Sequence, residues 1–167
     1  DSTKLVFALA YIASGVSMYV WLQSFLSKRA AFIGAVAYLF APYRFVDLYV
    51  RGAIGEHVAF IFPQLICFAI IAVARKKNAY SLLIGAVAVA GLLLSHNAIS
   101  LMLLPVMVLY SIFIFLKEKP GKSFFLKVIA FAVGGFALSA FFWIPAFFEG
   151  KYTRKKKAAA PASRKKK

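Results

Sequence analysis

Residues 98–116 read AISLMLLPVMVLYSIFIFL and contain no charged side chain. An α-helix needs about 20 apolar residues to cross the hydrocarbon core of a bilayer, and this stretch has that length. The whole chain of 167 residues is similar, with 63% hydrophobic and only 16% charged residues, whereas soluble domains use roughly 45–50% apolar residues. The composition predicts an all-α, polytopic integral membrane helix bundle. It excludes a water-soluble enzyme, a disordered chain and a coiled coil.

Other apolar segments flank this one on both sides. Together they predict about six transmembrane helices, over residues 5–26, 30–42, 57–73, 79–94, 98–116 and 124–148. The second segment would be only about 20 Å long at 1.5 Å per residue, so it must continue into residues 43–50 or stop inside the membrane. We therefore assign residues 1–150 to a transmembrane helical domain.

The net charge of +16 is concentrated at one end of the chain. Residues 151–167 hold nine of the 21 basic residues and no acidic one, which leaves 12 basic and five acidic residues, a net of +7, in the rest. Such a low-complexity, self-repelling segment is expected to be disordered, and we interpret it as an end foreign to the fold. The alternative is a polybasic segment held to anionic lipid headgroups. Nucleic acid is not a predicted partner.

Basic residues in the short loops predict the orientation. Nine of them share one side of the six-helix arrangement: Lys28, Arg29, Arg75, Lys76, Lys77, Lys117, Lys119, Lys122 and Lys127. The opposite side has Lys4, Arg44 and Arg51. The positive-inside rule makes the first side cytoplasmic and places the N-terminus outside.

A short polar segment follows the second apolar stretch. Its charges at Arg44, Asp47 and Arg51 have the spacing i, i+3 and i+7, which puts them on one helix face. Pro42 can begin this helix and Gly52 can end it. We predict a short amphipathic helix at the outer interface. Its charges either form a binding site or simply extend to the headgroups as an anchor.

Further polar residues lie on the same predicted side. Glu56 complements the positive end of the dipole of the helix that it begins, and this role alone could explain its presence. Alternatively, the flexible link of residues 52–55 brings Arg51 and Glu56 together around one bound group. In Ser95-His96-Asn97, Asn97 is expected to cap the next helix. His96 is either a hydrogen-bonded structural residue or a ligand or base, and a lone histidine is more often the former. The chain has one cysteine, Cys67, which excludes an intramolecular disulfide. It has only two histidines, so a divalent metal, although not excluded, has no support from the spacing of ligands.

Aromatic residues gather at this same predicted interface. Tyr43 and Tyr49 lie in the short amphipathic segment, and Trp143 lies in the FWIP sequence of residues 142–145. They form either an ordinary interfacial belt or a wall against which a lipid chain packs.

The stretches APYRFVDLYVRGA (41–53), Glu56, SHN (95–97), FWIP (142–145) and Glu149 resemble bacterial and archaeal membrane proteins of the 6-pyruvoyl-tetrahydropterin-synthase-related family. The resemblance runs from about Leu5 to Arg154, and no part of it looks like the soluble pterin enzyme. These membrane proteins are similar to C-type glycosyltransferases, which take sugar from a lipid-phosphate donor on the outer face. The resemblance implies a multi-pass protein of a prokaryotic cytoplasmic membrane.

The sequence departs from the glycosyltransferase pattern at one place. The catalytic acid there lies in the first outer loop after the first span, and no such loop precedes Leu5, so we expect an internal piece of a longer protein. Two functional hypotheses follow. A polyprenyl-phosphate-linked sugar would be bound by Arg44, Arg51 and His96, with Asp47 or Glu56 as general base and Tyr43, Tyr49 and Trp143 against the lipid chain. The alternative is a non-catalytic scaffold or a lipid-binding, transporter-like module.

Overall fold

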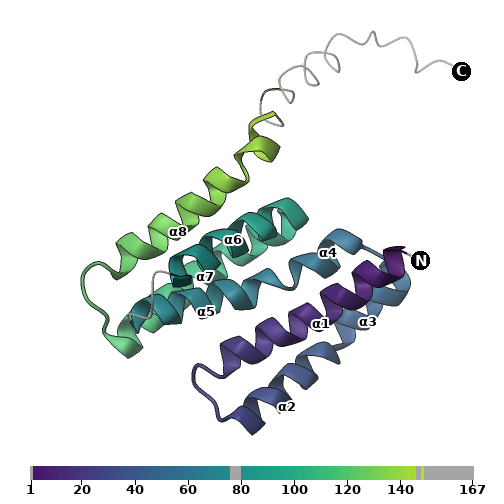
Figure 1. Cartoon of the computed structure of the whole chain (residues 1–167), viewed down its shortest axis with the longest axis horizontal. Helices are drawn as coiled ribbons and strands as arrows, with labels where there is room; N and C mark the ends of the chain where they lie inside the picture. The colour runs from purple at the N-terminus through teal and green to yellow at the C-terminus, as the bar shows by residue number, and fades with distance from the viewer. Residues whose placement is uncertain (1, 76–79, 146–147, 149–167) are drawn as a thin grey trace, which may run out of the picture.

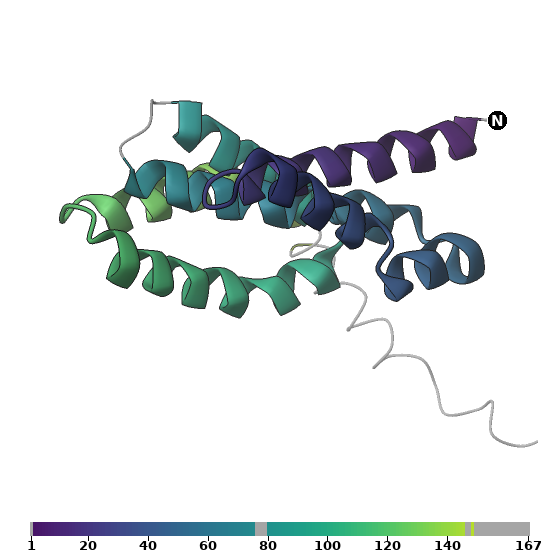
Figure 2. The same cartoon turned by 90° about the horizontal axis from the view of Figure 1, so that it is seen from below.

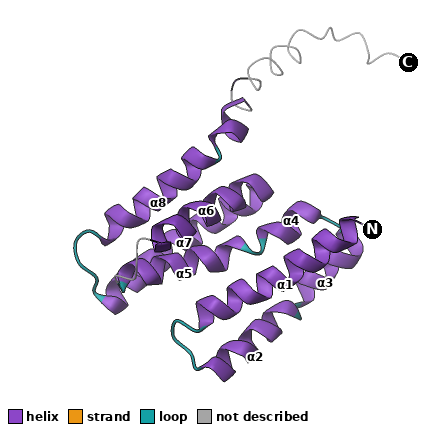
Figure 3. Cartoon of the chain, viewed as in Figure 1, coloured by secondary structure: helices purple, strands orange, loops and turns teal. Residues whose placement is uncertain are grey.

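A computed structural model of the protein describes residues 2–75, 80–145 and 148, and within them every regular element is helical (Figures 1 and 3). The elements are α1 (Ser2–Leu22), α2 (Lys28–Leu39), α3 (Pro42–Phe45), the π-helix η1 (Val46–Arg51), α4 (Ile54–Ala59), α5 (Phe62–Ala74), α6 (Tyr80–Ser95), α7 (Asn97–Glu118) and α8 (Phe124–Leu138). The predicted all-α class is confirmed. The basic segment 151–167 and Glu149 lie outside the described residues.

The described part of the chain has three helices long and apolar enough to cross a membrane: α1, α4 continued by α5, and α7. A fourth span results if α2 and the helical segment from α3 through η1, which are bent by 46° at their junction, are counted as one. Helices α6 and α8 are apolar but contain only 16 and 15 residues. The protein is therefore a membrane protein with several spans, and the predicted count of six is not confirmed.

The helices pack as two adjoining groups. Helix α1 packs on α2, α4 and α5, while α6 lies between α5 and α8 (Figures 1 and 2). Gly85 and Gly135 permit the close approach of α6 and α8, because a Cβ atom would come within 2.7 Å of the Phe131 ring at Gly85 and 2.5 Å of Val89 at Gly135. Small residues of this kind let two helix backbones approach closely. Ile70, Ala88 and Phe131 belong to the buried core between these helices.

One end of the bundle is held together by Arg75. Its guanidinium donates to the backbone oxygen of Ser24, just after α1, and to a carboxylate oxygen of Glu118, at the end of α7, over 2.8 Å. The bond to Glu118 raises the pKa of Arg75. Three of the loops predicted to be cytoplasmic thus begin at the same end of the molecule.

The predicted amphipathic helix is present as α3 and η1, and its ends are as expected. Pro42 lies in the first turn, and Gly52 ends η1 with a left-handed φ of 58°. The charged face, however, is not at the headgroups: Arg44 is 2% exposed and Asp47 0%, whereas Val50 is 78% exposed. The anchor hypothesis is therefore wrong for Arg44 and Asp47, because both side chains turn inward to polar groups of α1 and α4.

Candidate functional site

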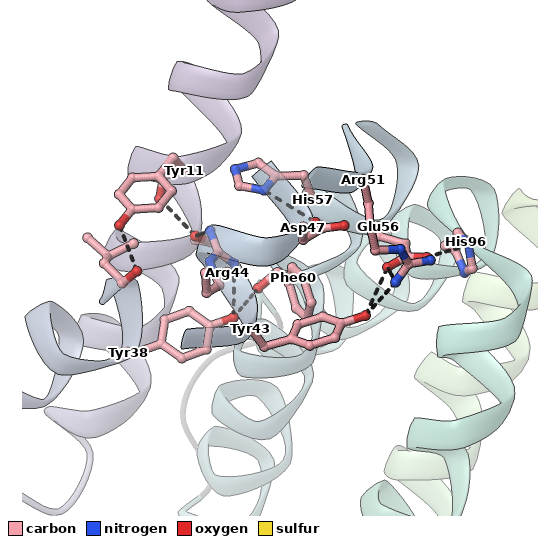
Figure 4. Close-up of polar contacts among 12 residues, drawn as sticks. Tyr11, Tyr38, Tyr43, Arg44, Asp47, Arg51, Glu56, His57, Phe60 and His96 are labelled. Atoms are coloured by element: carbon pink, nitrogen blue, oxygen red, sulfur yellow. Dashed lines mark hydrogen bonds and ion pairs between the residues drawn. The ribbon is translucent and has the colours of Figure 1, made fainter. Parts of the chain in front are cut away.

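Four of the predicted site residues meet at the start of α4. Arg51 donates from both terminal nitrogens to Glu56, with Nη1 2.8 Å from Oε2 (Figure 4). The Tyr43 hydroxyl donates to the same Oε2 over 3.1 Å and accepts from Arg51 Nη1 over 2.8 Å. His96 Nε2 lies 3.6 Å from Glu56 Oε1. We call Tyr43, Arg51, Glu56 and His96 the outer cluster.

The backbone explains why these residues meet. The left-handed turn at Gly52 reverses the chain after η1, so that Arg51 faces the first turn of α4, where Glu56 lies. Gly55 then fits against α6, because a Cβ atom there would lie only 2.7 Å from the backbone oxygen of Ser95. This close approach brings His96, the next residue, beside Glu56. The expected pairing of Arg51 with Glu56 across the glycine link is confirmed.

His96 also has the capping role that was predicted for Asn97. His96 has extended backbone angles, φ −160° and ψ 107°, and its Nδ1 accepts from the backbone N–H of Ile99 over 3.3 Å. Asn97 is already the first helical residue of α7. The capping prediction for Asn97 is therefore wrong: His96 is the N-cap, and its second ring nitrogen, Nε2, faces Glu56.

A second polar group, which we call the inner cluster, is buried behind the first and consists of Ser14, Arg44, Asp47 and His57. Arg44 donates to the Ser14 hydroxyl over 2.7 Å and to the Tyr38 hydroxyl over 3.4 Å. Its guanidinium also lies 4.9 Å from the ring centre of Phe60 and 5.2 Å from that of Tyr38. These contacts replace part of the hydration that Arg44 loses by burial.

Asp47 and His57 complete the inner cluster. The Asp47 Oδ2 atom lies 3.5 Å from His57 Nδ1, and both side chains are fully buried. The His57 ring lies between Phe7, at 5.2 Å and edge-on, and Tyr11, at 5.9 Å and stacked. Among the described residues, neither Asp47 nor His57 has a side-chain hydrogen bond within normal limits. A polar pair of this kind inside a membrane bundle is costly, so it marks a place of functional interest.

The structure thus does not bring Arg44 and Arg51 together on one anion. Arg44 and Asp47 belong to the inner cluster, whereas Arg51 and Glu56 belong to the outer one (Figure 4). Tyr49 is 78% exposed. Trp143 lies in the segment that follows α8, and its indole donates to the backbone oxygen of Phe136 in α8 over 3.0 Å.

His57 and Ser14 are not among the site residues predicted from the sequence. The only signal for His57 is its position beside Glu56, and a serine inside an apolar span is too common to be informative. In the described ranges, no group of three or more His, Cys, Asp or Glu side chains could hold a metal ion.

Comparisons with known proteins identify the family. The model of the 6-pyruvoyl-tetrahydropterin synthase related domain, described as a membrane protein, matches residues 2–163. No curated protein matches the chain, and no solved structure does. The family match covers nearly the entire sequence and agrees with the long apolar helices of the fold. The chain therefore belongs to the 6-pyruvoyl-tetrahydropterin synthase related family of membrane proteins.

Proposed function

We propose that this protein binds a polyprenyl-phosphate-linked sugar at the outer face of a prokaryotic cytoplasmic membrane and acts as a glycosyltransferase-like module. The observation that carries the proposal is the outer cluster, in which the 46% exposed Arg51 is held against the largely buried Glu56. A guanidinium that binds a carboxylate through two nitrogens presents the same planar fork to two phosphate oxygens. Arg51 is thus a preformed phosphate ligand whose present partner is a carboxylate.

Binding of a phosphate would also change the state of Glu56. When the donor's phosphate takes the Arg51 fork, the carboxylate loses its strongest partner and becomes available as a general base. In an inverting transfer, Glu56 would take the proton of the acceptor hydroxyl while that oxygen bonds to the anomeric carbon. The lipid phosphate would leave with the electron pair of the broken carbon–oxygen bond. His96, next to Glu56, would bind the phosphate or relay the proton.

The other predicted roles fit this arrangement unequally. Tyr49 and the neighbouring Val50 present exposed apolar surface to the bilayer, where a lipid chain would lie. Asp47 is a poorer candidate base than Glu56 because it is fully buried beside His57. Arg44 is enclosed by aromatic rings, so its proposed contact with the donor requires α3 to move.

A non-catalytic lipid-binding scaffold is the second candidate function. It is favoured by the occupation of both Glu56 oxygens, since each of them already accepts a hydrogen bond from Arg51. The two functions differ in one result. If the protein is an enzyme, replacing Glu56 would abolish sugar transfer. If it is a scaffold, replacing Glu56 would change the binding of the ligand alone.

The test compares the binding of a short-chain prenyl phosphate to the purified full chain and its variants. Arg51→Lys keeps the charge but removes the fork, so it should weaken binding about tenfold. Glu56→Gln removes the competing carboxylate and should tighten binding while abolishing any sugar transfer. Arg75→Lys is the matched control, because Arg75 forms a similar pair with Glu118 at the opposite end. Equal affinity of the wild type and Arg51→Lys would contradict the proposal.

A further inference from the structure

A groove separates α1 from the segment formed by α3 and η1. Its volume is about 740 Å³, and its walls include Phe7 and Ile12 from α1, and Phe45, Leu48 and Tyr49 from the opposite side. Because residues four apart share a helix face, Lys4, Ala8 and Ile12 form a continuous strip along α1. Figure 2 shows α1 and the α3–η1 segment diverging toward the N-terminus. The groove is therefore an elongated, largely apolar space beside a membrane span.

The charge in this groove has one sign. Among the described residues that line the groove, Lys4 is the one basic side chain and none is acidic. Lys4 is also exposed. No acidic side chain of the described ranges lies within ion-pair distance of Lys4. Lys4 lies in the first turn of α1 and thus at the end of the span, where a lipid headgroup is found. The groove therefore combines a cation at the membrane surface with apolar walls at the depth of the hydrocarbon chains.

We propose that this groove binds one anionic membrane phospholipid, with its phosphate on Lys4 and an acyl chain between Ile12 and Leu48. The lipid phosphate complements the positive charge of Lys4 at the end of the span. The acyl chain complements the apolar side chains that line the groove below it. Arg51 does not line the groove, so this site is separate from the outer cluster. The inference does not depend on sugar binding or transfer, and goes beyond the proposed function.

The bound lipid would also affect the inner cluster. Phe7 and Tyr11 line the groove and at the same time contact the His57 ring. A lipid chain that packs against these two rings holds α1 against α4 and keeps the Asp47–His57 pair dry. Binding should consequently raise the thermal stability of the protein, because a ligand that binds only the folded state stabilises it.

The test measures the melting temperature of the full chain in a neutral detergent with added phosphatidylglycerol or phosphatidylcholine. Phosphatidylglycerol should raise the melting temperature of the wild type more than phosphatidylcholine does. Lys4→Gln should abolish this difference. Its control is Lys28→Gln, which removes the same charge from an exposed position at the start of α2 and should keep the difference.

A second pair of variants tests the apolar walls. Ala8→Trp fills the groove and should abolish stabilisation by phosphatidylglycerol, whereas Ala37→Trp, at an exposed position on α2, should not. The proposal would be overturned if Lys28→Gln and Lys4→Gln lose the preference for phosphatidylglycerol equally, because general charge attraction would then explain it. It would also be overturned if Lys4→Gln keeps that preference. Inorganic phosphate should give no stabilisation; equal stabilisation by phosphate alone would overturn the role of the chain. If Ala8→Trp does not fold, native mass spectrometry of lipid retained by Lys4→Gln and Lys28→Gln decides.

Discussion

Arg44 shows how a single side chain can be assigned to the wrong environment on the basis of spacing alone. Its spacing from Asp47 correctly predicts that Arg44 and Asp47 share a helix face. The spacing does not say whether that face meets water, headgroups or protein. Here it meets Ser14 and a set of aromatic rings, which no local pattern near Arg44 could reveal. By contrast, the pairing of Arg51 with Glu56 is predictable, because only a short glycine-bounded link separates them.

Arg44→Lys should therefore reduce stability. Lysine keeps the positive charge but has one nitrogen in place of the two that donate to Ser14 and Tyr38, and it loses the flat contact with the rings. We expect the free energy of unfolding to fall by about 1–3 kcal/mol, measured by thermal or denaturant unfolding in detergent. Arg29→Lys, at an exposed position in α2, is the control. Equal unfolding free energies for Arg44→Lys and the wild type would show that the inner cluster does not support the fold.

At the scale of elements, the turn made by η1 determines where the site residues point. A π-helix turn contains an additional residue relative to an α-helix and occurs frequently at functional sites. In this chain it separates Asp47, which points inward, from Arg51, which reaches the start of α4. The sequence predicts a helix at this position, together with its first proline and its final glycine. It does not predict the π geometry, because that geometry depends on contacts made by α1 and α4.

The contact of α4 with α6 can be tested at Gly55. A Cβ atom at this position would lie 2.7 Å from the backbone oxygen of Ser95, and neither backbone can give way easily. Gly55→Ala should lower the free energy of unfolding by about 1–3 kcal/mol. Gly121→Ala, where nothing lies within 4 Å, should change it by less than about 0.5 kcal/mol. If both substitutions have the same effect, the close approach of α4 and the end of α6 is not as described.

At the scale of the molecule, the orientation of the helices in the membrane is the prediction with the clearest test. In a Cys67→Ser background, single cysteines at Asn97 and Lys122 report on the two ends of α7, and both positions are exposed. We expect a membrane-impermeant maleimide to label Asn97→Cys on intact cells and to leave Lys122→Cys unlabelled until the cells are broken. The physical reason is the excess of Lys and Arg in the loops near residue 122. Labelling of Lys122→Cys on intact cells would reverse the proposed orientation.

The overall class of the molecule was predictable, whereas the number of spans was not. Apolar content and run length suffice to identify α7, whose bounds agree with the predicted span within two residues. They cannot tell whether α2 and α3 form one bent span, because that depends on the backbone angle at the junction. The last predicted span, 124–148, begins with α8, has a turn at Ser139 and is helical again over residues 140–145.

The contacts of Arg75 also bear on how wide the far end of the molecule can open. They fix the chain just after the end of α1 to the ends of α5 and α7, whereas the first turn of α1 borders the groove. A helix of 21 residues is a rod of about 30 Å. If such a rod pivots by about 5° at its fixed end, its free end moves by about 3 Å. A small tilt of α1 would thus change the width of the groove while the basic end of the bundle stays still.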